Sequence, residues 1–288
     1  MKEILRFFKG KTVGVLGMGY VGVRLYNLLS SVPDIRILAL NRNSLQTIIE
    51  LETFDYFFNC AGNTGDFRSQ IDETIDSNLF LNQQLLKYLK IREAFVYLSS
   101  TRLYGFSQDK EQIFDEEYTP IESHTNIDFI YNGTKKLTES YLLNKSTNLK
   151  YKILICRLSN IFGDYKKHDL DDSTYIKVLI KHSLNKETIL IKQNLDTQKD
   201  YIFIEDALYG IINSVINSPK SDYFNIASGK SYSLRNWLTY LDLSYQVMTT
   251  EAIPLFSNIS IEKAKNTTGF KPVFYLHNLN KQHLISNE

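Results

Sequence analysis

A tyrosine and a lysine stand four positions apart in the segment FIYNGTKKLTESYL, which spans residues 129–142. On a helix, Tyr131 and Lys135 would share one face. A nearby cation lowers the pKa of a phenol, and a fall from about 10 to about 7 would let the tyrosine pass a proton at neutral pH. The same spacing recurs at Tyr141 and Lys145, so the pair alone does not identify a site.

A second cluster, VGVLGMGYVG, holds four of the 13 glycines of the chain. It lies between a predicted strand at 12–17 and a predicted helix at 20–30. Glycines in that setting allow a tight turn, let the backbone approach a pyrophosphate, and let the helix pack closely on the sheet, while the helix N-terminus faces the phosphates. The segment therefore predicts dinucleotide binding, with a glycine-rich turn that binds nothing as the alternative. The predicted contacts are Gly17, Gly19, Tyr20, Val21 and Gly22.

The second predicted strand, at 34–40, ends in the sequence LALNRN. An acidic residue at this place would accept hydrogen bonds from the adenosine ribose of NAD. Asn41 and Arg42 stand there instead, and a guanidinium suits a 2′-phosphate because it is bidentate and permanently charged. The sequence therefore predicts NADP(H) in preference to NAD(H), unless Arg42 is an ordinary surface cation.

Predicted strands and helices alternate along the rest of the chain. Further strands are predicted at 54–62, 94–100, 151–158 and 201–206, and helices at 76–90, 129–145 and 206–217. Asp206 is the expected N-cap of the last helix. The alternation predicts an α/β fold of the Rossmann type, with a doubly wound parallel sheet and ligands at the carboxyl ends of its strands.

The pattern loosens beyond residue 163, which predicts two interleaved units. We expect a dinucleotide-binding domain over 1–163 and a smaller substrate-binding lobe over 164–288. The chain should return to the first domain near 200–224, beginning with the strand at 201–206.

The composition excludes several classes of protein. A net charge of +1 over 288 residues gives no basic face for nucleic acid. No apolar run approaches the roughly 18 residues of a membrane span, and the N-terminus is too short and too charged for a signal peptide, so we expect a cytoplasmic protein without a membrane partner. Cys60 and Cys156 lie in apolar runs and should be buried thiols. Neither they nor His124, His168 and His182 form a metal-ligand pattern.

Six further segments, in order, resemble the motifs of one family. They are YLSSTRLYG for SSxxVYG, YNGTK for YxxxK, CRLSNIFG for RxxNxxG, QKDYIFIEDA for RDFVxVDDxA, YFNIASGKSYSL for xNxGxGxxxSxxE, and TTGFKP for LGxxP. With the glycine turn they span nearly the whole chain. The protein thus resembles the extended short-chain dehydrogenase/reductases, which are NAD(P)-dependent epimerases, dehydratases and reductases of nucleotide sugars.

The resemblance implies a catalytic site of Ser100, Tyr131 and Lys135. Ser100 would hold the substrate oxygen, Tyr131 would exchange a proton with it during hydride transfer, and Lys135 would bond the nicotinamide ribose. Tyr131 is preferred over Tyr141 because it lies 31 residues after Ser100, in the helix that follows that strand. Further contacts are expected from Cys60, Ala61 and Gly62 to the cofactor, and from Thr101, Arg102, Asn160 and Lys199 to the substrate. Lys199 replaces the arginine of the family motif.

Departures from the family pattern narrow the reaction. A 4,6-dehydratase has an Asp–Glu pair where this chain has Thr101 and Arg102. Epimerases usually hold NAD through an acidic residue, which Asn41 and Arg42 disfavour. The short connection from Arg42 to the strand near Phe54 is similar to that of dTDP-4-dehydrorhamnose reductases.

We therefore expect an NADP(H)-dependent reductase of a 4-keto nucleotide sugar. A nucleotide-sugar epimerase that retains NAD(P) and a non-catalytic dinucleotide-binding protein are the alternatives. A UDP-sugar 6-dehydrogenase would need a cysteine nucleophile, and neither cysteine has suitable surroundings. The resemblance also implies a homodimer that pairs through the helices at 76–90 and 129–145.

Overall fold

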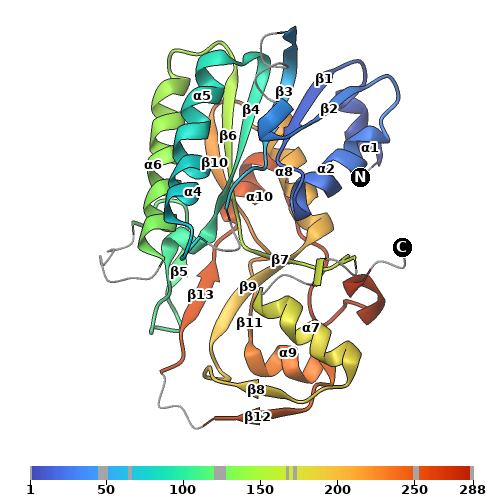
Figure 1. Cartoon of the computed structure of the whole chain (residues 1–288), viewed down its shortest axis with the longest axis vertical. Helices are drawn as coiled ribbons and strands as arrows, with labels where there is room; N and C mark the ends of the chain where they lie inside the picture. The colour runs from blue at the N-terminus through green and yellow to red at the C-terminus, as the bar shows by residue number, and fades with distance from the viewer. Residues whose placement is uncertain are drawn as a thin grey trace.

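The computed structural model describes residues 2–44, 51–63, 67–119, 128–166, 169–170, 174–248 and 253–285. His124 and His168 lie outside these residues. Within them, no helix combines the length and apolar character needed to span a membrane. A layered body of sheet and helices occupies one end of the long axis, and a smaller lobe lies at the other (Figure 1).

A six-stranded parallel sheet forms the centre of the larger unit. Its strands are β1 (Thr12–Leu16), β2 (Arg36–Leu40), β3 (Thr53–Asn59), β4 (Lys90–Ser100), β6 (Lys152–Leu158) and β10 (Asp222–Ile226). They lie in the order β10-β6-β4-β3-β1-β2, and every neighbouring pair is parallel. The strand order reverses between β1 and β3, as in a doubly wound sheet, which confirms the predicted Rossmann-type α/β fold.

The inner strands β1, β3 and β6 are buried over nearly their whole length because helices cover both faces of the sheet, whereas the edge strand β2 is mostly exposed or half-buried. In β4, Phe95 and Tyr97 pack into one core cluster, while Val96 and Leu98 pack into the other. Such alternation follows from the two-residue period of a strand. Between Phe54 and Tyr56 of β3 the register with β4 shifts, so the pairing is locally irregular there.

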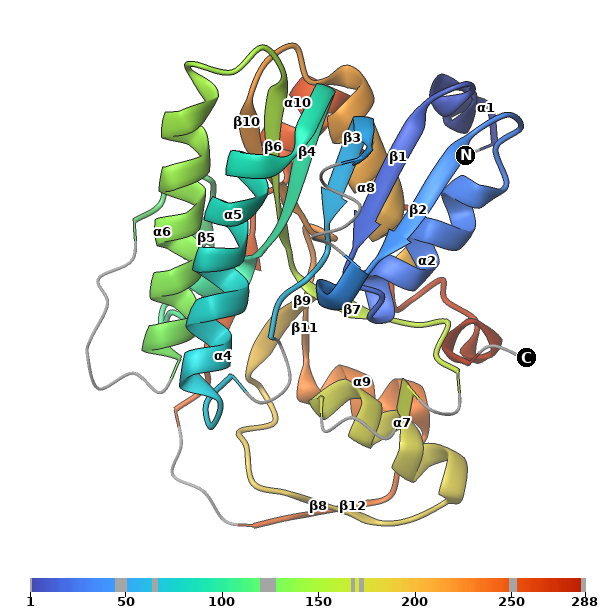
Figure 2. The same ribbon diagram turned by 45° about the horizontal axis from the view of Figure 1, so that its top comes forward.

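Helices cover both faces, as Figure 2 shows. On one face lie α2 (Tyr20–Ser30), α8 (Ile204–Asn217) and α10 (Glu262–Thr268). On the other lie α4 (Ile71–Ile75), a π-helical stretch (Asp76–Phe80), α5 (Leu81–Tyr88) and α6 (Phe129–Ser146). A short helix, α1 (Lys2–Leu5), and a 3-10 turn (Arg6–Phe8) precede β1.

One predicted helix begins earlier than expected, and one predicted helix cap was wrong. The helix expected at 76–90 begins at Ile71 and contains the π-helical stretch. Asp206 is not the N-cap of α8, because that helix begins at Ile204 and Phe203 occupies the cap position. The Asp206 carboxylate instead accepts hydrogen bonds from the backbone N–H groups of Val273 and Phe274.

The smaller lobe is built on a second sheet. It contains β11 (Ser231–Ser233), β9 (Gln198–Phe203), β13 (Phe256–Ile259) and β5 (Ile113–Phe114) in that order, with β7 (Asn160–Phe162) also paired to β9. The outer part consists of α7 (Tyr175–Asn185), α9 (Leu234–Leu241), β8 (Ile189–Ile191) and β12 (Tyr245–Val247). A 3-10 helix (Lys281–Leu284) lies near the end of the chain. The strand expected at 201–206 in the main sheet is thus β9 of this second sheet, and the chain rejoins the main sheet only at β10.

Candidate active site

A cavity of about 310 Å³ lies at the carboxyl ends of the central strands, where the main sheet meets the smaller lobe. Most of the residues predicted to form the site line it, namely Gly19, Tyr20, Val21, Gly22, Cys60, Ala61, Gly62, Ser100, Thr101, Arg102, Tyr131, Lys135, Asn160 and Lys199. Gly17, Asn41 and Arg42 do not line it. Segments far apart in the sequence therefore meet at the edge of the sheet where an α/β fold binds its ligands.

The glycine turn between β1 and α2 is closely packed on one side and open on the other. Gly17 has φ +89°, and a Cβ atom there would lie 2.5 Å from the backbone nitrogen of Ala61. A Cβ atom at Gly22 would lie 1.9 Å from the carbonyl oxygen of Gly17. At Gly19, the N-cap of α2, no described atom beyond the adjoining backbone lies within 4 Å of such a Cβ position, and no described side chain caps the helix. The free N–H groups and the open space suit a phosphate group.

The Ser100, Tyr131 and Lys135 side chains come together in the cavity. Ser100 ends β4, and its side chain lies close enough to that of Tyr131 to lower the pKa of the phenol. The Ser100 hydroxyl also accepts from the backbone N–H of Arg102 at 3.1 Å, which opens the 3-10 helix η3 (Thr101–Tyr104). Lys135 lies one turn beyond Tyr131 on α6 and donates from Nζ to the carbonyl oxygen of Leu98 at 3.0 Å. Tyr141 lies elsewhere, half-buried against the core beside the sheet.

The pKa of Tyr131 differs from the expectation. Burial raises it above its ordinary value, and the charge of Arg102 and the Ser100 hydroxyl only partly oppose that rise. The Lys135 ammonium stands 6.0 Å from the centre of the Tyr131 ring and is bonded to a backbone carbonyl. The expected lowering by Lys135 is therefore wrong for the protein without its ligands, because desolvation outweighs the neighbouring charges. Tyr131 carries its proton at neutral pH.

Lys135 is itself perturbed by burial. Its pKa falls to about 8 because the charged ammonium is removed from water, and the carboxylate of Glu139, one turn further along α6, opposes the fall. The ammonium also lies 4.7 Å from the centre of the Tyr97 ring.

Asn78, which was not predicted from the sequence, lies beside Gly62 and Lys135, which line the cavity. Its Nδ2 donates to Thr134 Oγ1 at 3.2 Å, whereas its buried Oδ1 has no partner among the described residues. A Cβ atom at Gly62 would lie 3.3 Å from that oxygen and 3.4 Å from Lys135 Nζ. Asn78 belongs to the π-helical stretch, a distortion often found at functional sites. An unpaired buried acceptor beside an ammonium and a bare glycine backbone fits a ligand with hydroxyl groups, such as the ribose of a dinucleotide.

Positive charge gathers where the smaller lobe approaches Tyr131. Asp128 forms ion pairs with Arg102 at 2.9 Å and with Arg68 at 2.8 Å. The Phe67 ring contacts both Tyr131 and Arg102: its centre is 4.6 Å from the centre of the Tyr131 ring and 5.3 Å from the Arg102 guanidinium. Burial, together with the charges of Arg102 and Arg68, lowers the pKa of Lys199.

Among the residues whose positions are described, two arginines thus pair with one carboxylate and Lys199 adds a further positive charge near them, which suits an anionic ligand. Arg68, Phe67 and Asp128 were not predicted, since nothing in their spacing links them to Tyr131. Asn160 donates from Nδ2 to the carbonyl oxygen of Asp200 at 2.8 Å, and Thr101 is buried beside Ser100.

Asn41 and Arg42 lie beyond the cavity, after the edge strand β2. Asn41 Oδ1 accepts from the backbone N–H of Ser44 at 2.9 Å, a local turn. Arg42 Nη1 lies 3.0 Å from Asp76 Oδ2, and both side chains are about half exposed, at 51% and 54%. No acidic residue directly follows β2 in the sequence, but the Asp76 carboxylate, from the π-helical stretch, lies next to Arg42.

Neither cysteine is a reactive thiolate at the site. Burial raises the pKa of the Cys60 and Cys156 thiols to about 12, so neither is a reactive thiolate. Cys156 is buried, and Cys60 is partly exposed to the cavity. No cluster of three or more potential metal ligands occurs within the described parts of the chain.

Residues 18–227 match the NAD dependent epimerase/dehydratase family. The chain is 22% identical over 246 residues to dTDP-4-dehydro-6-deoxyglucose reductase of Escherichia coli, a match that covers 82% of this chain and 73% of the relative.

Solved structures show the same fold. The structure of RMD from Pseudomonas aeruginosa complexed with NADPH has a TM-score of 0.76 and 20% identity, over 95% of this chain and 97% of the other. UDP-glucuronic acid 4-epimerase from Bacillus cereus, in complex with UDP-glucuronic acid and NAD, has a TM-score of 0.73 and 17% identity, over 92% and 95%.

Proposed function

The chain belongs to the NAD dependent epimerase/dehydratase family, and on this premise we propose that it is an NADP(H)-dependent reductase of a 4-keto nucleotide sugar. The observation that carries the proposal is the meeting of Ser100, Tyr131 and Lys135 beside the glycine turn, within one cavity. The name of the Escherichia coli relative, a reductase of a dTDP-4-keto sugar, supports the choice of reaction.

The cofactor would supply the hydride, and residues of this chain would donate the proton. Tyr131 donates its phenolic proton to the carbonyl oxygen of the substrate, so that the ketone becomes an alcohol. Ser100 holds that oxygen, and the charge of Arg102 stabilises the phenolate that remains. Because its pKa is raised by burial, Tyr131 holds its proton at neutral pH and can supply it in a reduction, although the raised pKa also makes it a weaker acid.

The residues present fit a nicotinamide dinucleotide. The turn Gly17–Gly22 and the start of α2, with Tyr20 and Val21, would hold the pyrophosphate, and Cys60, Ala61 and Gly62 would lie along the cofactor. Lys135 and the unpaired oxygen of Asn78 suit the nicotinamide ribose. Asn41 and Arg42 would bind the adenosine ribose and its 2′-phosphate, which is the reason for preferring NADP(H).

The nucleotide sugar would lie between η3 and the smaller lobe. Arg102 and Lys199 supply positive charge for its acidic groups, and Thr101 and Asn160 line the same cavity. Thr101 and Arg102 replace the Asp–Glu pair of 4,6-dehydratases, so elimination is not proposed. The division of the chain near residue 163 into a cofactor domain and a substrate lobe, and a location in the cytoplasm, are part of the proposal.

A homodimer is also part of the proposal. Ile71, Phe80, Tyr88 and Leu137 lie on the helices α4–α6 and are about half exposed. An apolar surface on two adjacent helices suits pairing with a second copy as a four-helix bundle.

The test is NADPH oxidation with a panel of 4-keto nucleotide sugars that differ in base and sugar. We expect one NADPH consumed per alcohol formed and cofactor that binds reversibly. Interconversion of two nucleotide sugars without net NADPH consumption, by protein that retains NAD(P) through purification, would show the epimerase instead. Cofactor binding with no turnover of any member of the panel would favour a non-catalytic binding protein.

A further inference from the structure

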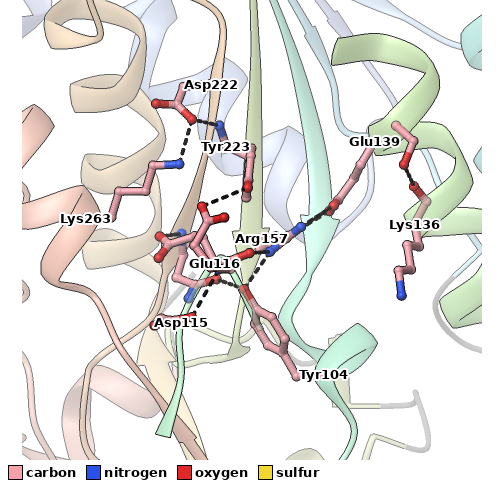
Figure 3. Close-up of polar contacts among 12 residues, drawn as sticks. Tyr104, Asp115, Glu116, Lys136, Glu139, Arg157, Asp222, Tyr223 and Lys263 are labelled. Atoms are coloured by element: carbon pink, nitrogen blue, oxygen red, sulfur yellow. Dashed lines mark hydrogen bonds and ion pairs between the residues drawn. The ribbon is translucent and has the colours of Figure 1, made fainter. Parts of the chain in front are cut away.

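A buried arginine on β6, Arg157, joins the two segments that carry the proposed proton-transfer residues (Figure 3). Its Nε lies 3.1 Å from both carboxylate oxygens of Glu139, and its Nη2 donates to one of them at 2.6 Å. Its Nη1 donates to the Tyr104 hydroxyl at 2.7 Å and to the carbonyl oxygen of Glu116 at 3.1 Å. The Arg157 and Glu139 side chains are only 10% and 3% exposed.

The two partners of Arg157 belong to the segments that hold the site. Glu139 follows Lys135 by one turn of α6 and Tyr131 by two, so the three side chains lie near one face of the helix. Tyr104 ends η3, four residues after Ser100. Arg157 therefore ties the helix of Tyr131 and Lys135 to the segment of Ser100.

Further hydrogen bonds leave the network little freedom to shift. The Tyr104 hydroxyl donates to Asn225 Oδ1 at 2.8 Å, and the backbone N–H of Asn225 donates to Glu116 Oε1 at 2.7 Å. The Tyr223 ring covers the Arg157 guanidinium at 4.6 Å. Lys263 lies 3.9 Å from the centre of that ring and pairs with Asp222 at 2.6 Å, on the outer side of the network (Figure 3).

The charge of Glu139 also faces Lys135. The Lys135 ammonium is buried, and the groups around it are Tyr131 and Glu139 from α6, Tyr97 from β4 and the neutral amide of Asn78 from the π-helical stretch. Glu139 is the carboxylate that raises the pKa of Lys135 against the effect of burial. A buried ion pair is seldom a net stabiliser, because its desolvation cost can exceed its attraction. Stability alone is therefore a weak reason for this pair.

We propose that Arg157 and Glu139 are positioning residues of the proposed reaction. The pair fixes α6 against η3, so that Tyr131 and Lys135 stand opposite Ser100, and Glu139 provides the counter-charge of the Lys135 ammonium. The catalytic role of the pair rests on the proposed function. The effect of Glu139 on the titration of Lys135 can be tested without a substrate.

The first test is Glu139→Gln, which keeps the shape and an acceptor for Arg157 but removes the charge. We expect the titration midpoint of Lys135 to fall by on the order of one pH unit. It is read by NMR in protein labelled at the lysine side-chain nitrogens, with Lys135→Met to assign the signal. In steady-state assays kcat should fall on the order of 10- to 100-fold, with a smaller change in the KM of the nucleotide sugar. In the pH profile of kcat, the loss of activity at alkaline pH should begin at a lower pH than in the wild type.

Asp222→Asn is the matched control. Asp222 belongs to the same group of charges, yet it pairs with Lys263 and touches neither α6 nor η3. Its loss should lower the unfolding temperature while the Lys135 midpoint stays unchanged and kcat stays within about twofold.

A double variant, Glu139→Leu with Arg157→Met, separates placement from stability. It fills the same space without charge and should fold, because apolar replacements of a buried ion pair are tolerated. We expect it to fold and to be as impaired in kcat as Glu139→Gln. If Glu139→Gln itself does not fold, the double variant should still fold and should show a kcat on the order of 10- to 100-fold below that of the wild type. Wild-type kcat in the double variant, or an unmoved Lys135 midpoint in Glu139→Gln, would overturn the inference. A shifted midpoint in a protein that reduces no member of the panel would instead refute the proposed function and leave the tie between Glu139 and Lys135 standing.

Discussion

The proposed preference for NADP(H) depends on one exposed arginine, and Arg42→Ala tests it. Arg42 is paired with Asp76 at 3.0 Å, with side chains 51% and 54% exposed. A solvent-exposed ion pair contributes only about 0–1 kcal/mol. Charge-assisted hydrogen bonds to a phosphate contribute about 1.5–3 kcal/mol. The 2′-phosphate should therefore displace Asp76 from Arg42 when NADPH binds.

The expected magnitude follows from this difference. Loss of about 1.5–3 kcal/mol weakens NADPH binding by about 10- to 150-fold, since each 1.4 kcal/mol is a factor of ten. NADH has no 2′-phosphate, so its affinity should change little. Asp76→Asn removes the competing carboxylate and should tighten NADPH binding by about 2- to 5-fold, the value of an exposed pair of 0.5–1 kcal/mol.

Equilibrium titration of wild type, Arg42→Ala and Asp76→Asn with NADPH and NADH measures these changes. The NADPH affinity of the wild type should also weaken with rising salt more steeply than that of Arg42→Ala. The reasoning is refuted if the wild type binds NADH more tightly than NADPH, or if Arg42→Ala leaves the NADPH affinity unchanged.

Three further predictions concern the glycine turn, a buried acid and the helices α4–α6. Gly22→Ala should abolish dinucleotide binding in titrations, because its Cβ atom would lie 1.9 Å from the Gly17 carbonyl oxygen; Gly133→Ala, with no atom near its Cβ position, should bind normally. Burial raises the pKa of Asp206 to about 6. Between about pH 4 and 6 the folded protein therefore keeps a proton on this carboxyl group that the unfolded chain has released, and the resulting stabilisation is lost as the pH rises through 6. Denaturant unfolding should therefore show wild type losing stability relative to Asp206→Asn between about pH 4 and 6, and a constant difference contradicts this. Leu137→Glu should convert a dimer to a monomer in sedimentation, and a wild type that is already monomeric at micromolar concentration refutes the dimer.

Patterns of apolar residues were enough to predict five of the six strands of the main sheet, because a strand covered on both faces tends to be an apolar run. They did not predict β10, whose sequence DYFNI includes Asp222 and Asn225. They could not assign the strand at 198–203 to the second sheet, since apolar periodicity says nothing about which neighbour a strand pairs with. The local cap rule failed at Asp206 because α8 begins two residues earlier, at Ile204, and the Asp206 carboxylate accepts hydrogen bonds from the backbone of a distant loop, at Val273 and Phe274.

Some residues of the candidate site could likewise be predicted from the sequence, and others could not. Ser100, Tyr131 and Lys135 could be placed together because the resemblance to a known family links the serine at a strand end to the tyrosine and lysine of the following helix. Asn78 and Asp128 could not be found, because a π-helical stretch and contacts between separate segments bring them there. The spacing of Tyr131 and Lys135 also could not reveal that Lys135 bonds the Leu98 carbonyl, nor that burial would dominate the pKa of Tyr131.

The most direct test of the central claim compares Tyr131→Phe with Tyr141→Phe, two tyrosines that each precede a lysine by four positions on the same helix. With NADPH and a 4-keto nucleotide sugar that the wild type reduces, Tyr131→Phe should lower kcat by about 10²- to 10⁴-fold while NADPH still binds, because only proton donation is lost. Tyr141→Phe should keep wild-type activity. Full activity in Tyr131→Phe would contradict the account, since no phenol at position 131 would then be needed for the reaction.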